Sequence, residues 1–244
     1  MARLLYVCVR PEEGAAAAEH ASFARGLGQP VDRHDLLSTP LGEEDIARYA
    51  GVVVGGSPLN VSDPDATELQ RRVEGDLERL AEAAIASRTA ALFTCYGIGV
   101  VTRMLGGRVT LDHPEPASAV WVRTRDAAAS DPLFAPSAPG FHAFSAHKEA
   151  SAAAPPDAVL LASSAGCPVQ AYRVGTRLWA TQFHPEPTPR DFAERMGFYR
   201  TGAYFAPEDY ERARNEVLAA SVTEPAQILA RFAAVATRPE GPRG

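Results

Sequence analysis

A cysteine with the surroundings of a nucleophile lies within the stretch Phe93-Thr-Cys-Tyr-Gly97. Residues 89–94 form a short apolar run that predicts a buried strand, and residues 97–105 predict a helix, so Cys95 falls at a strand-to-helix turn. The N-terminus of that helix would direct N–H groups and partial positive charge towards the sulfur, which favours the reactive thiolate. From these residues alone, a small cysteine buried in the core is the alternative interpretation.

A histidine and a carboxylate that could complete such a site follow much later in the chain. Residues 178–183 predict a strand that runs directly into His184-Pro-Glu186. A histidine at a strand end can act as general base for Cys95, and a carboxylate two residues further on can bind its second ring nitrogen and fix the tautomer. If the three side chains do not meet, His184 is an ordinary hydrogen-bonded histidine and Glu186 a surface carboxylate. The pattern therefore predicts a Cys-His-Glu triad of Cys95, His184 and Glu186.

Three motifs together resemble a known family. Cys95-Tyr-Gly97, Leu105-Gly-Gly107 and Gln182-Phe-His-Pro-Glu186 are similar to motifs of the class I glutamine amidotransferases, most closely of their GMP-synthetase-like glutaminase domains. The order, with the cysteine first and the His-x-Glu pair far downstream, also fits that family. The resemblance covers residues 52–186, and Gln-Phe-His-Pro-Glu is its most specific part.

The resemblance implies further site residues around the cysteine. Gly55 and Gly56 match the family's Gly-Gly loop, and backbone N–H groups of Gly56 and Tyr96 would form the oxyanion hole. Ser57 follows in the same loop and is expected beside the substrate together with Gly55. His147 lies where related proteins carry a short His-containing stretch near the glutamine pocket, so it is a further candidate for substrate binding.

Two positions depart from the family pattern. Members usually have glycine two residues before the cysteine, where this chain has Phe93, so either that side chain points away from the turn or the turn is less tight. Members also usually have glutamine four residues after the cysteine, where this chain has Gly99. Because that glutamine helps to hold the substrate, we expect Gly99 to lie in the substrate pocket and Gly99→Gln to improve the use of glutamine.

The order of elements predicts an α/β fold of three layers: a mostly parallel sheet with helices on both faces and an added antiparallel strand extension. In the first part of the chain, strands are expected at 3–9, 31–37, 51–54 and 90–94, and helices at 14–27, 43–49, 66–87 and 97–105. Ligands of such sheets bind at the carboxyl ends of the strands. Both the Gly55 loop and Cys95 follow strand ends, which brings them to one edge.

The second part of the chain is expected to extend the sheet and return His184 to Cys95. Shorter strands are predicted at 118–125, 141–145, 158–164, 169–174 and 178–183, and helices at 191–199, 207–220 and 223–235. We expect residues 1–236 to form a single domain and residues 237–244 a disordered tail.

Composition narrows the possible partners and cofactors. The 244 residues are 46% hydrophobic with a net charge of −6. The sequence contains no basic stripe, so nucleic acid is not an expected partner. No apolar run approaches the ~20 residues of a membrane span. Three scattered cysteines predict no disulfide framework, which indicates a reducing cytoplasm. No Cys/His spacing suggests a metal site, and no cofactor is expected.

The function that these features imply is hydrolysis of the side-chain amide of L-glutamine, or of another γ-glutamyl amide, through a thioester on Cys95. Because no synthase half follows in the sequence, ammonia would pass to a separate synthase or acceptor protein. A γ-glutamyl peptide hydrolase with the same triad is the first alternative, since Gly99 leaves room for another substrate. A non-enzymatic binding module that keeps the fold is the second.

Overall fold

The central feature of the molecule is a mixed sheet. The computed structural model describes residues 3–200 and 207–238, and within them nine strands form one sheet in the order β2-β1-β3-β4-β11-β10-β9-β6-β7. Neighbours from β2 to β11 pair in parallel, and neighbours from β11 to β7 pair antiparallel. The predicted mostly parallel sheet with an antiparallel extension is confirmed.

The parallel part consists of β1 (Leu4–Cys8), β2 (Asp32–Asp35), β3 (Gly51–Val54), β4 (Ala90–Thr94) and β11 (Leu178–Thr181). The antiparallel part consists of β6 (Glu115–Thr124), β7 (Gly140–His147), β9 (Ala158–Ser163) and β10 (Ala171–Val174). A separate pair joins β5 (Val109–Thr110) to β8 (Ala150–Ser151). The strands β1, β3, β4 and β11 are buried along their whole length, as expected where helices cover both faces of a sheet.

The α-helices are α1 (Glu13–Leu27), α2 (Glu43–Ile46), α3 (Glu68–Ile85), α4 (Tyr96–Met104), α5 (Pro189–Phe198), α6 (Tyr210–Ala219) and α7 (Glu224–Thr237). Short 3₁₀ turns are η1 (Asp126–Ser130), η2 (Ala135–Ser137) and η3 (Pro207–Asp209). Local signals set several ends. Gly28 closes α1 with a left-handed φ of 70°, the Thr67 side chain caps α3, and Thr188 caps α5 ahead of Pro189.

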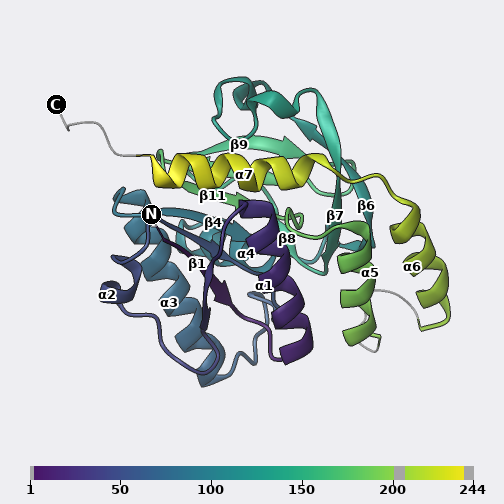
Figure 1. Cartoon of the computed structure of the whole chain (residues 1–244), viewed down its shortest axis with the longest axis horizontal. Coiled ribbons are helices and arrows are strands. Elements are labelled where there is room, and N and C mark those ends of the chain that lie inside the picture. Colours follow the sequence, from purple (N-terminus) through teal and green to yellow (C-terminus); the bar gives the residue numbers. More distant parts are fainter. Residues whose placement is uncertain (1–2, 201–206, 239–244) are drawn as a thin grey trace.

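Helices cover both faces of the parallel strands, and the apolar core is divided accordingly. One cluster joins alternate residues of β1, such as Tyr6, to α1 and α7 through Phe23 and Phe232. The other joins the opposite face to α3 and α4 through residues such as Leu77 and Val101. Figure 1 shows α7 crossing over the strands on the same side as α1, with α3 and α4 beyond the sheet. The predicted three-layer arrangement is therefore present.

The helices α5 and α6 form a separate layer at the antiparallel end. Figure 1 shows them side by side next to β6 and β7. Phe192 and Met196 of α5, with Tyr210 and Val217 of α6, pack against Phe144 of β7. This small core places α5 directly beside the ends of the strands that carry the candidate site.

The observed boundaries differ from the predicted ones in a few places. β6 begins at Glu115, three residues before the predicted strand, and β10 begins at Ala171, two residues after it. α7 continues through Thr237, one residue beyond the predicted end of the domain. Residues 239–244 of the predicted disordered tail lie outside the described residues. Among the helices described, none is both long enough and apolar enough to span a membrane.

Candidate active site

Cys95 lies at a sharp turn between β4 and α4. Its φ of 52° and ψ of −99° are unusual for a residue with a side chain, because a left-handed φ crowds Cβ against the backbone. A hydrogen bond of 2.8 Å from the Cys95 N–H to the Thr181 carbonyl holds the turn against β11. Phe93, the departure from the family pattern, points into the core against Gly97, where an added Cβ would lie 2.9 Å from the Phe93 Cβ. Gly97 therefore provides the room for the bulky residue before the turn.

Strand pairing brings the candidate groups to one edge of the sheet. Val54 pairs with Phe93, and Thr94 pairs with Thr181, so β3, β4 and β11 end side by side. The loops that follow these strands carry the Gly-Gly stretch, the cysteine and the histidine. A hydrogen bond of 2.8 Å from the His184 N–H to the Phe144 carbonyl fixes the histidine loop against β7.

The three predicted triad residues lie together and are all buried. His184 Nδ1 is 3.1 Å from Glu186 Oε1, so the carboxylate engages one ring nitrogen and leaves Nε2 for proton transfer. A Cβ added to Gly56 would lie 2.8 Å from His184 Cε1 and 3.5 Å from Cys95 Cβ, which places the imidazole and the cysteine against the same small loop. The Cys95 thiol itself lies 3.8 Å from the Ala146 carbonyl.

Electrostatics favour a charged imidazole. Burial lowers the pKa of His184, but the charges of Glu186 and Cys95 outweigh that effect and raise the pKa to about 9. Burial raises the pKa of Glu186, whereas Arg195 and His184 lower it further than burial raises it, so Glu186 stays ionised. The arrangement can therefore hold a proton on the imidazole beside a nucleophilic sulfur.

A buried network of charges lies behind the imidazole. Arg195 Nη1 lies 2.6 Å from Glu186 Oε1 and 3.3 Å from Glu19 Oε1, and Arg10 Nη2 lies 2.7 Å from the same Glu19 oxygen. Tyr6 also donates to Glu19, at 2.7 Å. Two guanidinium groups thus balance two carboxylates, with every one of these side chains at most 5% exposed. Such pairing is what permits charges to be buried at all.

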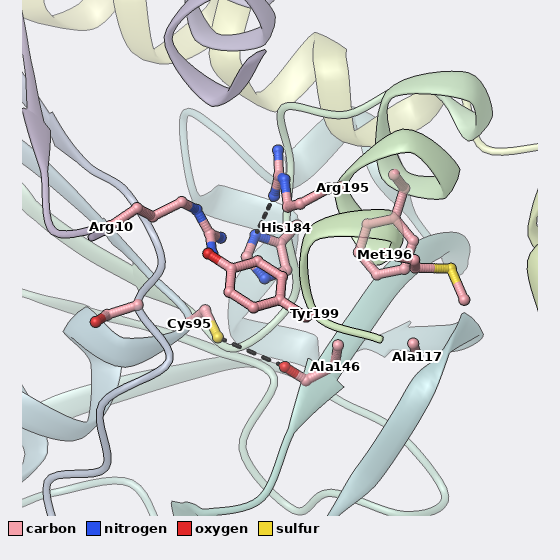
Figure 2. A pocket seen from close by; sticks show the side chains of 10 residues that line it. Arg10, Cys95, Ala117, Ala146, His184, Arg195, Met196 and Tyr199 are labelled. Atoms are coloured by element: carbon pink, nitrogen blue, oxygen red, sulfur yellow. Dashed lines mark hydrogen bonds between the residues drawn. The ribbon is translucent and has the colours of Figure 1, made fainter. Parts of the chain in front are cut away.

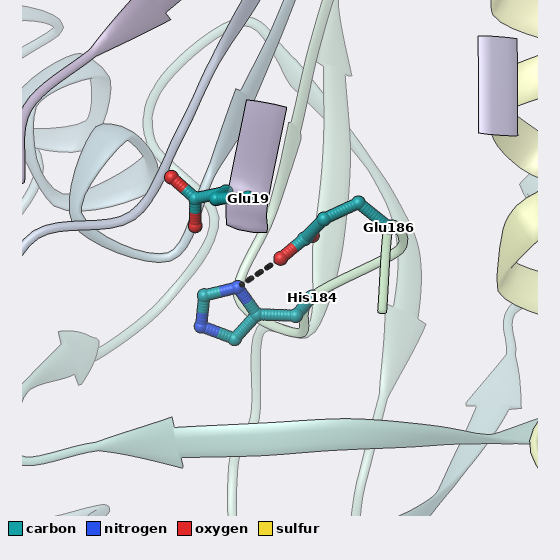
Figure 3. A group of neighbouring side chains, drawn as sticks. All are labelled: Glu19, His184 and Glu186. Carbon is teal, nitrogen blue, oxygen red and sulfur yellow. Dashed lines mark hydrogen bonds and ion pairs between the residues drawn. The ribbon is translucent and has the colours of Figure 1, made fainter. Parts of the chain in front are cut away.

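Glu19, His184 and Glu186 come close enough together to resemble a metal site (Figure 3). The two arginines argue against that interpretation. The Arg195 guanidinium contacts both carboxylates, and Arg10 contacts Glu19, so the negative charge that would attract a cation is already neutralised. We therefore continue to interpret these residues as a charge network and not as a metal site, and the absence of a metal stays a prediction.

The predicted oxyanion donors differ in where they point. Tyr96 is the first residue of α4, where an N–H has no partner within the helix. The Gly56 N–H instead makes a long hydrogen bond of 3.4 Å to Glu19 Oε1, so its role as an oxyanion donor stays a prediction. Gly55 packs behind the loop, where an added Cβ would lie 2.2 Å from Glu19 Oε2 and 2.8 Å from Tyr6 Cε2. Close packing therefore requires glycine at this position, and the predicted contact of Gly55 with substrate stays a prediction.

Two hollows open on either side of Cys95. The first, with a cavity of about 40 Å³, is lined by His184, Arg10, Tyr199 and the apolar side chains of α5 (Figure 2). The second, with a cavity of about 20 Å³, is lined by Tyr96, Gly99 and the segment 146–150. Ser57, predicted beside the substrate, lines both, as do Cys95 and Ala146. His184 lines only the first of the two.

Gly99 lines the second hollow, as predicted, but the space above it is occupied. A Cβ at this position would lie 3.1 Å from Val61 Cγ2 and 3.5 Å from Glu149 Oε1. The Glu149 carboxylate in turn accepts hydrogen bonds of 2.6 Å and 2.9 Å from the backbone N–H groups of Val61 and Ser62. This chain thus places a loop and a carboxylate where the family usually has a glutamine side chain.

His147 borders the second hollow, but both of its ring nitrogens are engaged by the protein. Nε2 lies 3.0 Å from Glu115 Oε2, and Nδ1 lies 3.0 Å from the Glu149 carbonyl. Ser145, Ser164 and His147 all bind the Glu115 carboxylate and lower its pKa to about 2, against the raising effect of burial. His147 lines this hollow with both ring nitrogens already bonded within the protein, and its role in substrate binding stays a prediction.

Sequence reasoning missed Arg10, Glu19, Arg195 and Tyr199. One signal was available for Glu19, because it shares the apolar face of α1 with Ala15, Ala16 and Phe23 at helical spacing. A charged residue on a buried face needs a partner. The identity of that partner could not be found, because Arg195 lies 176 residues further along the chain.

The match to a family model identifies the class of protein. Residues 20–200 match the model described as Glutamine amidotransferase class-I, which is well over half of the chain. The chain therefore belongs to the class I glutamine amidotransferase family, as its motifs predicted.

Curated relatives with similar sequences are larger proteins. GMP synthase (glutamine-hydrolyzing) of Thermomicrobium roseum is 32% identical over 137 residues, which cover 56% of this chain and 23% of that protein. The GMP synthase of Thermotoga maritima is 25% identical over 179 residues, which cover 72% of this chain and 32% of that protein. The chain thus matches about a quarter to a third of the length of these relatives.

Solved structures of similar length share the fold. The structure of SMU.1228c superposes with a TM-score of 0.76 at 18% identity, covering 97% of this chain and 100% of the other. A glutamine amido transferase from Methylobacillus flagellatus superposes with a TM-score of 0.73 at 19% identity, covering 100% of this chain and 99% of the other. The predicted fold class is confirmed by these neighbours.

Proposed function

We propose that the chain is a glutaminase that hydrolyses the side-chain amide of L-glutamine and supplies ammonia to a separate acceptor protein. The observation that supports this most is the meeting of Cys95, His184 and Glu186 at the ends of neighbouring strands, with Glu186 Oε1 3.1 Å from His184 Nδ1. The family match and the glutamine-hydrolysing relatives support the same substrate.

In the proposed reaction, the proton of Cys95 resides on His184 Nε2, and the thiolate sulfur attacks the amide carbon of the substrate. The tetrahedral oxyanion would be stabilised by the Tyr96 N–H at the start of α4. His184 then protonates the nitrogen, the C–N bond breaks, and ammonia leaves a glutamyl thioester on Cys95. A water molecule that gives its proton to His184 attacks the thioester and releases glutamate, which restores the Cys95 thiolate beside the protonated imidazole.

The second hollow suits the amino-acid end of the substrate. Asn60, Lys148 and Glu149 contribute polar and charged groups to its wall, beside the start of α4. A substrate with a free ammonium and carboxylate needs such groups, because burying unpaired charges is costly. In this orientation the γ-carbonyl reaches Cys95 and the scissile nitrogen points towards His184.

The test is Cys95→Ala, with Cys167→Ala as its matched control. Cys167 is also buried, and the Cys167 thiol donates to the Val169 carbonyl, away from the triad. We expect Cys95→Ala to abolish glutamate release and labelling by a glutamine-like diazoketone, while its melting temperature stays near that of the wild type. The Cys167→Ala protein should keep both properties. Full activity in a folded Cys95→Ala protein would refute the assignment.

A further inference from the structure

The position of the general acid distinguishes the two hollows beside Cys95. The nitrogen that leaves the tetrahedral intermediate takes its proton from His184, so the leaving group must lie on the His184 side. His184 lines the first hollow, whereas Tyr96 and Gly99 line the second. If the γ-glutamyl group occupies the second hollow, the leaving amine enters the first.

The first hollow has more room than ammonia requires. Its cavity of about 40 Å³ exceeds the roughly 10 to 15 Å³ that one water molecule, close in size to ammonia, needs on the same measure. One wall is apolar. Figure 2 shows Ala117 of β6 and Met196 of α5 in it, and Phe192 of α5 also lines the hollow. Neither ammonia nor ammonium gains binding free energy from such a wall, whereas an alkyl group does.

The charged residues in this hollow are already paired. Arg10 lies 2.7 Å from Glu19, and Arg195 lies 2.6 Å from Glu186, so neither guanidinium carries an unbalanced charge. Arg10 also donates to the Tyr199 hydroxyl at 3.0 Å. Apart from the catalytic His184, the hollow therefore offers an apolar wall and charged groups that already have partners, so an uncharged amine substituent fits it better than a charged one.

We propose that the first hollow is a leaving-amine subsite, and that the chain hydrolyses γ-glutamyl amides whose amine carries an apolar group. This inference rests on the proposed function, because it uses the same nucleophile and acid. The γ-carbonyl carbon bonds to Cys95 Sγ as its bond to nitrogen breaks, and the nitrogen leaves as the free alkylamine after taking a proton from His184. Water then cleaves the thioester to glutamate and the thiol.

The first experiment compares kcat/KM of the full chain for glutamine, γ-glutamyl-n-butylamide and γ-glutamyl-2-methoxyethylamide, with glutamate release as the common readout. The two alkylamides have the same length and differ by one CH₂ replaced with oxygen. We expect the butylamide to exceed glutamine, and to exceed the methoxyethylamide at least threefold. A butylamide value below that of glutamine, or equal to that of the methoxyethylamide, would overturn the inference.

The second experiment narrows the hollow. Ala117→Leu adds three carbons at its wall, and Ala119→Leu adds them two residues further along β6, outside the hollow. We expect the ratio of kcat/KM for butylamide over glutamine to fall at least tenfold in Ala117→Leu and to stay within twofold in Ala119→Leu. Ala117→Val provides a smaller change if the leucine variant does not fold. An unchanged ratio in a folded variant would place the amine elsewhere.

Failure of the inference can be told apart from failure of the proposed function. Hydrolysis of glutamine alone would overturn the inference and keep the glutaminase assignment. Hydrolysis of none of the three amides would overturn both. Activity on the amides that persists in Cys95→Ala would refute the shared nucleophile, and with it both proposals.

Discussion

Replacing Arg195 should show how strongly the buried charge network stabilises the protein. Arg195→Met keeps a side chain of similar length and removes the charge and every donor. Glu186 and Glu19 would then face each other across the gap, with Arg10 as the remaining guanidinium for Glu19. The Arg195 side chain is 5% exposed and both carboxylates are 0% exposed, so water cannot replace the lost partner.

The expected magnitude follows from this burial. Removing one partner of a buried ion pair typically destabilises a protein by about 3 to 5 kcal/mol. For a chain of this size, 1 kcal/mol corresponds to roughly 2 to 4 °C in melting temperature, so the melt should fall by about 6 to 20 °C. The control is Arg25→Met, because Arg25 pairs with Asp191 while 49% exposed. Exposed pairs contribute about 1 kcal/mol or less.

Chemical denaturation and thermal melts of both variants measure the effect. Adding Glu186→Gln to Arg195→Met removes the carboxylate that has lost its guanidinium and leaves the Arg10–Glu19 pair intact, so it should recover at least ~1 kcal/mol, a coupling expected of residues in direct contact. A loss below ~1 kcal/mol in Arg195→Met, or a loss equal to that of Arg25→Met, would refute the conclusion that the network stabilises the site.

Two further predictions concern the site. Gly99→Gln should not improve the use of glutamine, in contrast to the expectation from the family pattern, because Val61 Cγ2 lies 3.1 Å from the added Cβ. Overpacking should lower the free energy of unfolding by about 1 to 3 kcal/mol, as measured by denaturant titration. A stable variant with a higher kcat/KM for glutamine would contradict this prediction and show that the loop moves aside. The pKa of His184 is raised to about 9 by Glu186 and Cys95 against the effect of burial, so protonation stabilises the folded state fully below its ordinary value of about 6.5. That contribution to stability, ~3 kcal/mol, is lost as pH rises through 9, and the loss should be absent in His184→Asn. Parallel pH profiles of the unfolding free energy in the wild type and in His184→Asn would contradict this prediction.

The elements of the fold could be predicted because local patterns determine them. The apolar runs of β1, β3 and β4 and the helical spacing along α3 are visible within windows of a few residues. The strand-end positions of Cys95 and His184 then follow from the way parallel strands share one carboxyl edge. Strand ends in the antiparallel part were less accurate, because the irregular pairing of β6 with β7 depends on partners far along the chain.

The surroundings of the site could not be predicted in the same way. Whether the Gly56 N–H points to substrate or to Glu19 depends on where α1 packs, which no local pattern specifies. The hydrogen bonding of the His147 ring depends likewise on Glu115, which lies 32 residues earlier on a neighbouring strand. The room above Gly99 is determined by a loop that Glu149 holds in place. Each of these features is a tertiary contact between segments whose own sequences are unremarkable.

The backbone conformation that positions the Cys95 thiol for catalysis lowers the stability of the fold. A residue with a side chain at a φ of 52° and ψ of −99° carries strain of about 1 to 3 kcal/mol, which glycine would largely avoid. The turn keeps its shape because β11 and the core hold it, so glycine would fit there with less strain and without a thiol. A screen of variants for heat resistance alone would therefore enrich proteins that have lost their nucleophile, and selection for robustness in this fold needs an activity readout at every round.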